Sequence, residues 1–190
     1  MSGLKPLEVY AFTWNMARKS QLGVKWEIII PEPQKYDLII FSAQEADAKS
    51  KMADSMKAYL GPDYIKVGYI EMWEMFTVAF LKKQHAPFFK NPETNYLTLG
   101  VMNVVGNKGG LMLQFTLFDR TFNIINVHLT SGTGKAHKRA EMMANILRGI
   151  AVAKAQDKVE PDSVCDFNYI MGDMNWRTKR TYSECIDSVE

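Results

Sequence analysis

Asp173 and Asn175, an aspartate and an asparagine two positions apart, follow the apolar run 167–171 and Gly172. The run is rich in aromatic and β-branched residues, so it predicts a buried strand. Side chains at positions i and i+2 of an extended chain point the same way. A carboxylate and a carboxamide held together at a strand tip could align a water molecule and donate a hydrogen bond to an anionic oxygen. The alternative is an Asx turn that caps the strand, which is the commoner use of an isolated Gly-Asp-x-Asn.

Three other predicted strands, over residues 7–14, 37–43 and 122–127, also end in polar side chains. These are Asn15, Gln44-Glu45 and Asn126-Val127-His128. When neighbouring strands run parallel, their carboxyl ends share one edge of a sheet, and sites in layered α/β proteins form at such edges. We therefore expect the polar tips of all four strands to converge.

The converging side chains suit a metal-assisted phosphoesterase. Glu45 is a hard oxygen ligand for Mg²⁺, and Asn15 offers an uncharged oxygen beside it. Mg²⁺ keeps several waters and needs only one or two carboxylates plus substrate phosphate, so a sparse ligand set is expected. Asp173 could orient or deprotonate a water, while Asn175 and His128 hydrogen-bond the phosphate oxygens as charge develops. Together, a metal ion, an aligned water and hydrogen-bond donors that hold the phosphate predict hydrolysis of a phosphoester.

Each of these residues also has a plainer interpretation. Glu45 could begin a helix predicted over residues 46–60, where a carboxylate stabilises the positive helix end. His128 could be a structural histidine, and Asn15 could be a turn residue. The joint occurrence of polar groups at four strand ends favours the catalytic interpretation.

Two basic residues are candidates for contact with substrate phosphate, Lys108 and Arg139. Lys108 lies in Gly106-Asn107-Lys108-Gly109-Gly110, which lacks the G-x-x-x-x-G-K-[ST] pattern and predicts a hairpin turn between strands. Arg139 lies in the first turns of a helix predicted over residues 135–154, close to Lys135 and Lys138. With Arg177 these residues could form a basic rim, and ordinary solvated charge is the alternative.

Composition bounds the class of protein. The 190 residues carry 23 Lys and Arg against 21 Asp and Glu, a net charge of +2 that gives no reason to expect a nucleic acid partner. The length suits a single domain over residues 1–190. The first residues have no apolar signal core, no apolar run could span a bilayer, and Cys165 and Cys185 have no metal-type spacing. We expect a cytoplasmic protein whose membrane contact, if it has any, is peripheral.

The order of elements predicts a mixed arrangement of strands. Strands are predicted over 64–72, 76–81, 96–105 and 111–117, and residues 84–95 are predicted to be a loop because they contain Pro87 and Pro92. Short turns between most strands favour antiparallel hairpins. Two packed sheets with helices outside fit this order better than a doubly wound parallel sheet does.

Taken together and in order, five segments resemble the catalytic domain of the inositol polyphosphate 5-phosphatases. They are Thr13-Trp14-Asn15, Gln44-Glu45, Val105-Gly106-Asn107-Lys108-Gly109-Gly110, Asn126-Val127-His128-Leu129-Thr130-Ser131-Gly132 and Gly172-Asp173-Met174-Asn175-Trp176-Arg177. The Gly-Asn-Lys-Gly-Gly loop with the later Asn-x-His-Leu is specific to that family. The glutamate and Gly-Asp-x-Asn alone indicate only the wider metal-dependent endonuclease/exonuclease/phosphatase superfamily.

The resemblance implies an α/β (α+β) fold, a four-layered sandwich of two mixed β-sheets flanked by helices. It also implies Mg²⁺-dependent removal of the 5-phosphate from phosphoinositide lipids or soluble inositol polyphosphates. Carried over residue by residue, Glu45 with Asn15 beside it would bind the metal, and Asp173 would align the attacking water. Asn175 and His128 would hold the scissile phosphate, and the substrate-binding candidates would be Lys108 and Arg139.

This sequence departs from the family in one large respect. The family has a Pro-Ala-Trp-x-Asp-Arg segment and then a Ser-Asp-His segment after Gly-Asp-x-Asn, and neither is present here. The second segment supplies a catalytic histidine–aspartate pair. We therefore expect a piece of a longer protein, with a sandwich incomplete at its carboxyl-terminal end and without full activity on its own. The alternatives are another phosphoesterase of the same fold, a nuclease or sphingomyelinase, and a non-catalytic phosphoinositide-binding module.

Overall fold

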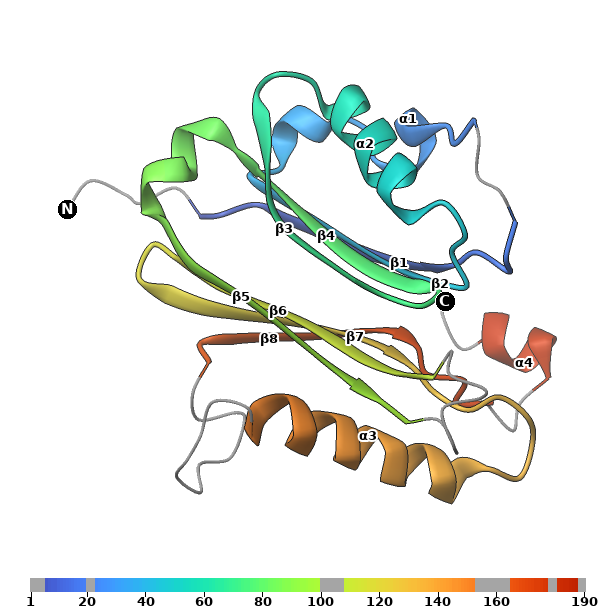
Figure 1. Ribbon diagram of the computed structural model, residues 1–190. Coiled ribbons are helices and arrows are strands. Elements are labelled where there is room, and N and C mark those ends of the chain that lie inside the picture. Colours follow the sequence, from blue (N-terminus) through green and yellow to red (C-terminus); the bar gives the residue numbers. More distant parts are fainter. Residues whose placement is uncertain (1–5, 20–22, 100–107, 153–164, 178–180, 188–190) are drawn as a thin grey trace.

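The computed structural model describes residues 6–19, 23–99, 108–152, 165–177 and 181–187. Two four-stranded sheets lie face to face in it. Helices α1 (Trp26–Ile29) and α2 (Lys49–Leu60) cover the outside of the first sheet, and α3 (Ala136–Val152) covers the outside of the second (Figure 1). This helix–sheet–sheet–helix order confirms the predicted four-layered sandwich.

Both sheets mix parallel and antiparallel strands. The first has the order β1-β2-β4-β3 and consists of β1 (Val9–Asn15), β2 (Leu38–Gln44), β3 (Tyr64–Met72) and β4 (Met75–Lys82). The second has the order β5-β6-β7-β8 and consists of β5 (Phe89–Thr98), β6 (Gly109–Leu117), β7 (Arg120–His128) and β8 (Phe167–Asp173). In each sheet one pair is parallel, β1 with β2 and β7 with β8, and the other described pairs are antiparallel. A doubly wound parallel sheet is therefore excluded.

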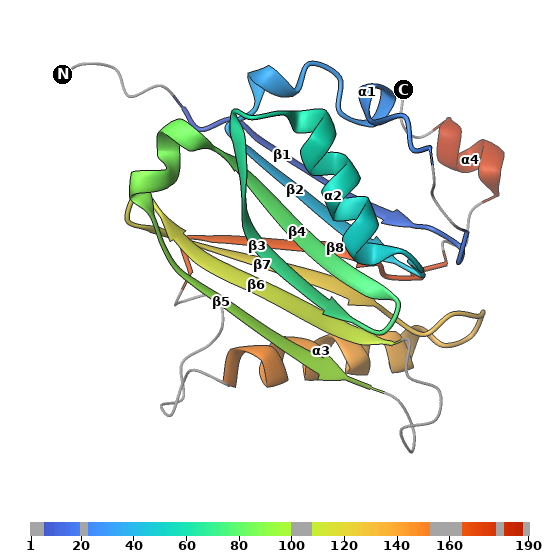
Figure 2. The same ribbon diagram turned by 45° about the horizontal axis from the view of Figure 1, so that its top comes forward.

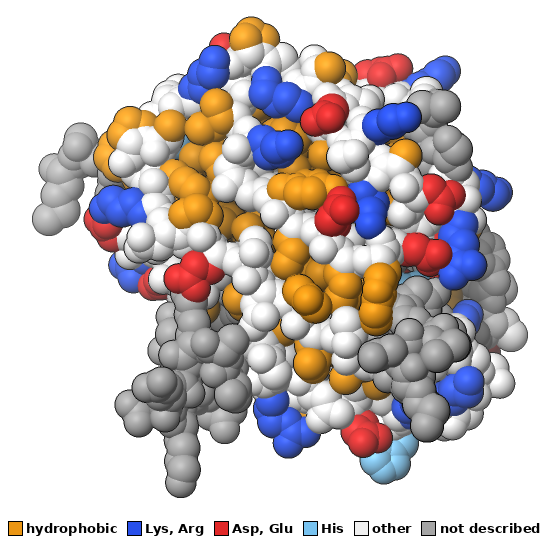
Figure 3. Space-filling model, viewed as in Figure 1, with side chains coloured by type: hydrophobic (Ala, Val, Ile, Leu, Met, Phe, Trp, Pro, Cys, Tyr) orange, Lys and Arg blue, Asp and Glu red, His pale blue; other side chains and the backbone are white. Residues whose placement is uncertain are grey.

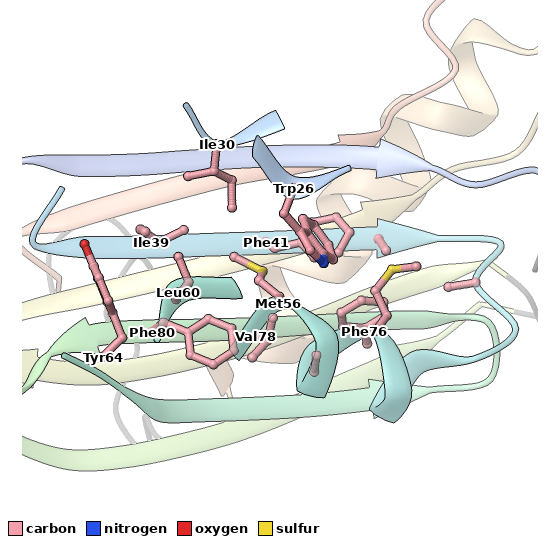
Figure 4. Close-up of a cluster of buried hydrophobic side chains, with 14 of the residues drawn as sticks. Trp26, Ile30, Ile39, Phe41, Met56, Leu60, Tyr64, Phe76, Val78 and Phe80 are labelled. Carbon is pink, nitrogen blue, oxygen red and sulfur yellow. The ribbon is translucent and has the colours of Figure 1, made fainter. Parts of the chain in front are cut away.

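The outer face of the first sheet packs against α1 and α2. Trp26 of α1 and Met56 of α2 lie over Phe41 and Phe76 of the sheet (Figure 4). Met52, Met56 and Leu60 recur at helical spacing, so one stripe of α2 is buried against the strands. This layer fixes the backbone of β2, which leads directly to Glu45.

The two sheet faces that pack against each other are apolar at one end of the strands and polar at the other. At one end they are apolar, with Leu38, Ile40, Phe122 and Ile124 in a common cluster. The following inward positions on the same strands are polar, namely Ser42 and Gln44 on β2 and Asn126 and His128 on β7. Because alternate residues of a strand share a face, this polar half lies directly beneath the strand tips.

The third layer of the core lies between α3 and the second sheet. Met142, Ile146 and Ile150 of the helix pack against Ile125 and Val127 of β7. The short elements complete the described chain, namely two 3-10 helices, η1 (Pro33–Lys35) and η2 (Lys83–Phe88), and α4 (Tyr182–Ile186). The sequence analysis did not predict α4, although Thr181 and Glu184 form a capping box at its start.

The predicted loop over residues 84–95 is wrong. This stretch forms η2 and the first half of β5. Pro92 is tolerated because β5 is an edge strand, and its register shifts between Lys90 and Glu93. The strand predicted over residues 96–105 is the second half of β5 as far as Thr98, and residues 100–105 lie outside the described part of the chain.

Within the described ranges, the helices are too short or too polar for any of them to cross a membrane. On the face seen in Figure 3, Lys and Arg side chains alternate with Asp and Glu and with apolar side chains. This mixed surface agrees with the small net charge of +2.

Candidate active site

The polar tips of the four strands meet at one edge of the sandwich, as the sequence predicted. In the parallel pair β1–β2, Asn15 lies opposite Gln44, and in the pair β7–β8, His128 lies opposite Asp173. The two sheets bring β1 and β8 into contact at this edge (Figure 2). Side chains from both sheets therefore share one site.

The carboxylates of Glu45 and Asp173, which come from different sheets, both contact the side chains of Asn15 and His128. The amide nitrogen Nδ2 of Asn15 donates hydrogen bonds to Oδ2 of Asp173 at 2.8 Å and to Oε1 of Glu45 at 3.3 Å. Nε2 of His128 lies 3.6 Å from each of these carboxylate oxygens. The side chain of His128 is 1% exposed, while those of Glu45 and Asp173 are 27% and 25% exposed. The carboxylates thus face solvent above a buried imidazole.

A left-handed turn directs Glu45 into the site. Strand alternation would point Glu45 towards α2, but its φ of 52° redirects the chain. Its carbonyl accepts a hydrogen bond from the backbone of Arg18 at 2.9 Å, and Ala46 N donates to Glu74 O at 2.9 Å. Helix α2 begins only at Lys49. The alternative in which Glu45 serves to begin that helix is therefore wrong.

Lys108 contacts the catalytic candidate His128. Its Nζ lies 2.5 Å from Nε2 of His128, within hydrogen-bonding distance. Burial lowers the pKa of Lys108, and the carboxylates of Glu45 and Asp173 oppose that shift. The lysine is positioned by Leu99 N, which donates to its carbonyl at 3.0 Å at the base of the β5–β6 hairpin. Residues 105–107 of the predicted glycine-rich turn lie outside the described ranges.

Asn175 reaches the site by a different route from the one predicted. Its φ is 52°, so the chain has left the extended conformation and the simple i, i+2 alignment with Asp173 is wrong. Asn175 N donates to Oδ1 of Asp173 at 3.0 Å, which confirms the Asx turn. The Asn175 amide then donates to Leu129 O at 3.1 Å and accepts from Arg177 at 2.9 Å.

A close approach of β8 to β7 explains the glycine before Asp173. Gly172 has a φ of 129°, and a Cβ atom there would lie 2.1 Å from the carbonyl oxygen of Val127. Only glycine fits this conformation and this contact. The Gly-Asp-x-Asn pattern therefore has a structural cause as well as a chemical one.

Arg139 is buried, so it does not belong to the solvent-facing basic rim that was predicted. It is 2% exposed and donates to the carbonyls of Gly132 at 2.9 Å, Thr130 at 3.4 Å and Trp176 at 3.4 Å. Its side chain therefore lies beneath the loops that follow β7 and β8. The other predicted rim residues within the described ranges, Lys135, Lys138 and Arg177, are exposed.

Gln44 and Asn126 belong to the polar strand ends, but the sequence analysis assigned them no role. In the structure, Gln44 Nε2 donates to Oδ1 of Asn126 at 2.8 Å, and it also donates to Oγ1 of Thr13 at 2.9 Å. Asn126 in turn donates to the carbonyls of Ala43 at 3.2 Å and Phe76 at 3.0 Å, on the opposite sheet. The sequence could have indicated their inward position, because each lies an even number of residues from the inward apolar residues of its own strand.

The donor set fits Mg²⁺ in part. Two carboxylates, Glu45 and Asp173, face the same space, and Mg²⁺ is commonly bound by one or two carboxylates with water and phosphate. No cluster of three or more His, Cys, Asp or Glu with metal-binding geometry occurs among the described residues. Asn15 turns its nitrogen to the carboxylates, while its oxygen accepts from Ala17 N at 3.0 Å. It would have to rotate its amide to act as an oxygen ligand.

Comparison with known proteins agrees with this geometry. The sequence profile of Endonuclease/Exonuclease/phosphatase family 2 matches residues 12–190. The chain is 26% identical over 204 residues to phosphatidylinositol 3,4,5-trisphosphate 5-phosphatase 2A of Danio rerio. The alignment covers 96% of the chain and 16% of that protein. The chain thus spans less than a fifth of this curated relative.

Two solved structures share the fold. The inositol polyphosphate 5-phosphatase domain of SPsynaptojanin, in complex with inositol (1,4)-bisphosphate and calcium, has a TM-score of 0.79 at 22% identity, over 96% of this chain and 56% of that one. TDP2 of Danio rerio, complexed with a single-strand DNA product, has a TM-score of 0.55 at 16% identity, over 88% of this chain and 61% of that one. Since the family profile covers nearly all of the sequence, the chain belongs to Endonuclease/Exonuclease/phosphatase family 2.

Proposed function

We propose that this chain provides most of the active site of a Mg²⁺-dependent phosphatase. Its substrates would be phosphoinositide lipids or soluble inositol polyphosphates, from which it removes the 5-phosphate. The observation that carries the proposal is the convergence of Glu45, Asp173 and Asn15 over the buried His128 and the half-buried Lys108. The name of the Danio rerio relative, a phosphatidylinositol 5-phosphatase, supports the choice of substrate.

Each residue has a role that follows from its position. Glu45 would hold Mg²⁺, with Asn15 as a second ligand once its amide has rotated. The bound ion would stabilise negative charge on the phosphate. Asp173 would orient the attacking water and accept its proton, because its carboxylate lies 25% exposed at the strand tip.

The phosphate would be held by donors from the second sheet. An asparagine amide has two N–H groups, and Leu129 accepts only one from Asn175, so the other is available for a phosphate oxygen. Lys108 contacts His128 with one N–H of its ammonium, and its remaining N–H groups would be directed at a second oxygen. Both donors would strengthen their hydrogen bonds as charge develops in the transition state.

The test is release of inorganic phosphate from an inositol trisphosphate that carries the 5-phosphate, with inositol (1,4)-bisphosphate as the matched substrate that lacks it. Two forms are assayed, namely this chain and the same chain extended at its carboxyl end by the two family segments named above. We expect Mg²⁺-dependent release from the trisphosphate by the extended form, and none after chelation. Equal release from both substrates, or release that persists without metal, would contradict the proposal.

We propose no nucleic acid as substrate, although TDP2 shares the fold. Non-specific nucleic acid binding depends on neutralising many phosphates, and a net charge of +2 provides little for that. Single-stranded DNA should therefore be neither cleaved nor able to compete with the inositol trisphosphate. Cleavage of DNA at a comparable rate would favour a nuclease instead.

We further propose that the protein is cytoplasmic and that this edge of the sandwich touches membranes. Trp73 and Trp176 are 43% and 50% exposed, and both lie in turns at the end of the sheets that holds the site. The turn at Trp73 is anchored to the loop of Glu45 through Ala46 N and Glu74 O at 2.9 Å. Indole rings prefer the interface between lipid and water, and Arg18, which pairs with Glu74 at 3.0 Å, is an exposed cation near Trp73 that would attract anionic headgroups.

Replacing Trp73 with serine should weaken binding to anionic vesicles and slow hydrolysis of vesicle-bound lipid several-fold, because an interfacial anchor is lost. Hydrolysis of a soluble inositol trisphosphate should not change. Phe88→Ser is the matched control, since Phe88 is 48% exposed but ends η2, at the opposite end of β4. Equal losses for Trp73→Ser and Phe88→Ser in vesicle sedimentation would rule out this docking edge.

A further inference from the structure

Arg139 occupies a position that the helix pattern reserves for an apolar residue. It shares one stripe of α3 with Met142, Ile146 and Ile150, all of which pack against the second sheet. Arg139 is itself 2% exposed. Arginine is almost never fully buried unless it is paired, so its presence on this stripe needs a cause.

The guanidinium joins two loops to the start of α3. Nη1 donates to the carbonyls of Gly132 and Thr130, in the loop that follows β7, and Nη2 donates to Trp176 O, in the loop that follows β8. In the described part of the chain, its hydrogen-bond acceptors are therefore backbone carbonyls, and its Nε is buried without a partner. The side chain thus serves to hold backbone geometry.

These two loops carry the groups that would meet phosphate. His128 ends β7 immediately before the first loop, and Asn175 precedes Trp176 in the second. The loops also touch each other directly, because Asn175 donates to Leu129 O and Leu129 N donates to Asp173 O at 2.9 Å. His128 is already fixed in the strand ladder, where it pairs with Gly109 and Asp173. Asn175 has no such support.

The backbone around Trp176 needs external support. Asn175 and Arg177, on either side of it, have φ angles of 52° and 53°. Asparagine adopts this left-handed conformation readily, but an arginine holds it only where the surrounding structure enforces it. The carbonyl that Arg139 binds lies between these two residues, so the guanidinium acts at the point of strain.

We propose that Arg139 is a positioning residue, which clamps the loops after β7 and β8 together and thereby aims the amide of Asn175 at the scissile phosphate. This role rests on the proposed phosphatase function. An arginine is needed because its planar fork presents separate N–H groups to two loops, whereas a lysine ammonium acts as a single point charge. Lysine at this position would keep the charge and lose the bridge.

The kinetic test is a double-mutant cycle in the form of the protein that releases phosphate. Arg139→Lys should lower kcat by up to about 100-fold with little change in KM, the size expected when a reacting group is displaced by about 1 Å. In an Asn175→Ala background the same change should leave kcat nearly unaltered, because the group that Arg139 aims is gone. Additive losses in the double mutant would overturn the proposal. Arg148→Lys is the control, since Arg148 lies exposed on α3 and, among the described residues, bonds to Ala144 and Asn145 of that same helix.

A spectroscopic test separates the clamp from the phosphatase function. The chain has four tryptophans, so 5-fluorotryptophan gives four fluorine signals, and Trp176→Phe assigns the one of interest. Arg139→Lys should shift and broaden the Trp176 signal while those of Trp14, Trp26 and Trp73 stay in place. An unmoved Trp176 signal would overturn the clamp. A moved signal in this chain, with no phosphate release by the extended form, would support the clamp and refute the proposed function.

Discussion

Replacing Glu45 with glutamine should reduce Mg²⁺-dependent phosphate release by about 1000-fold or more, since charge stabilisation by a bound metal is worth several kcal/mol. The substitution keeps the size of the side chain and its contact with Asn15 at 3.3 Å. It removes the negative charge that would neutralise the ion. The expected result is a large fall in kcat together with a higher Mg²⁺ concentration for half-maximal activity.

The control for Glu45→Gln is Glu71→Gln. Glu71 lies on β3 of the same sheet, with a side chain 45% exposed and a distant pairing to Lys49 at 3.7 Å. Exposed ion pairs of this kind contribute about 0–1 kcal/mol, so the control should retain the parent activity. If Glu45→Gln released phosphate as fast as Glu71→Gln, the metal site would have to lie elsewhere.

The same variant separates an enzyme from a binding module. A non-catalytic phosphoinositide-binding module would use the basic side chains of the site edge, which Glu45→Gln leaves intact. Vesicle binding should survive the substitution in either case. Loss of turnover with binding retained is expected for the phosphatase, whereas a parent protein that binds vesicles and never releases phosphate would favour the module.

Strand alternation explains how much of this site could be predicted. Asn15, Gln44, Asn126 and Asp173 fall on inward positions, in phase with apolar residues of the inter-sheet core. Period-2 patterning is visible in a sequence, and the parallel pairing of β1 with β2 and of β7 with β8 then places these residues at one edge. The convergence was therefore predictable from the residues.

Backbone dihedral angles explain what could not be predicted. Alternation assigns Glu45 to the outer face, and only a φ of 52° returns it to the site. Asn175 depends in the same way on a left-handed turn at its own position. Such turns are common for asparagine but carry no sequence signal at glutamate, so the roles of these two residues followed from their chemistry and from the resemblance, and not from strand alternation.

The prediction for Arg139 was wrong for a different reason. Its charge and its place near the start of a helix favoured a solvent-facing rim, and that interpretation ignored the helix period. Arg139 shares a stripe with Met142 and Ile146, so the helix period alone assigns it to the core. A charged residue in phase with core positions is a better guide to a positioning role than to a surface contact.

The Asn126–Gln44 pair should carry a large part of the stability of the fold. Asn126 is fully buried and links β7 to the carbonyls of Ala43 and Phe76, on the facing sheet. Replacing Asn126 with leucine removes its hydrogen bonds to those two carbonyls and the one that it accepts from Gln44, whose amide keeps its bond to Thr13. Each buried polar group left unpaired costs about 1–3 kcal/mol, so we expect a loss of roughly 2–4 kcal/mol. For a domain of this size that corresponds to a fall in Tm of roughly 5–15 °C.

The control for Asn126→Leu lies three residues earlier on the same strand. Asn123 is also buried, but its amide donates at 3.0 Å to Asn168 of the neighbouring strand in the same sheet, and its own oxygen has no partner within the described ranges. Asn123→Leu should therefore cost less, and it should not alter Mg²⁺ affinity. Asn126→Leu should weaken Mg²⁺ binding as well, because Gln44 precedes Glu45 and Asn126 lies two residues before His128. Equal Tm losses for the two variants in thermal unfolding would show that the hydrogen bonds of Asn126 to the facing sheet stabilise the fold no more than the bond of Asn123 within its own sheet.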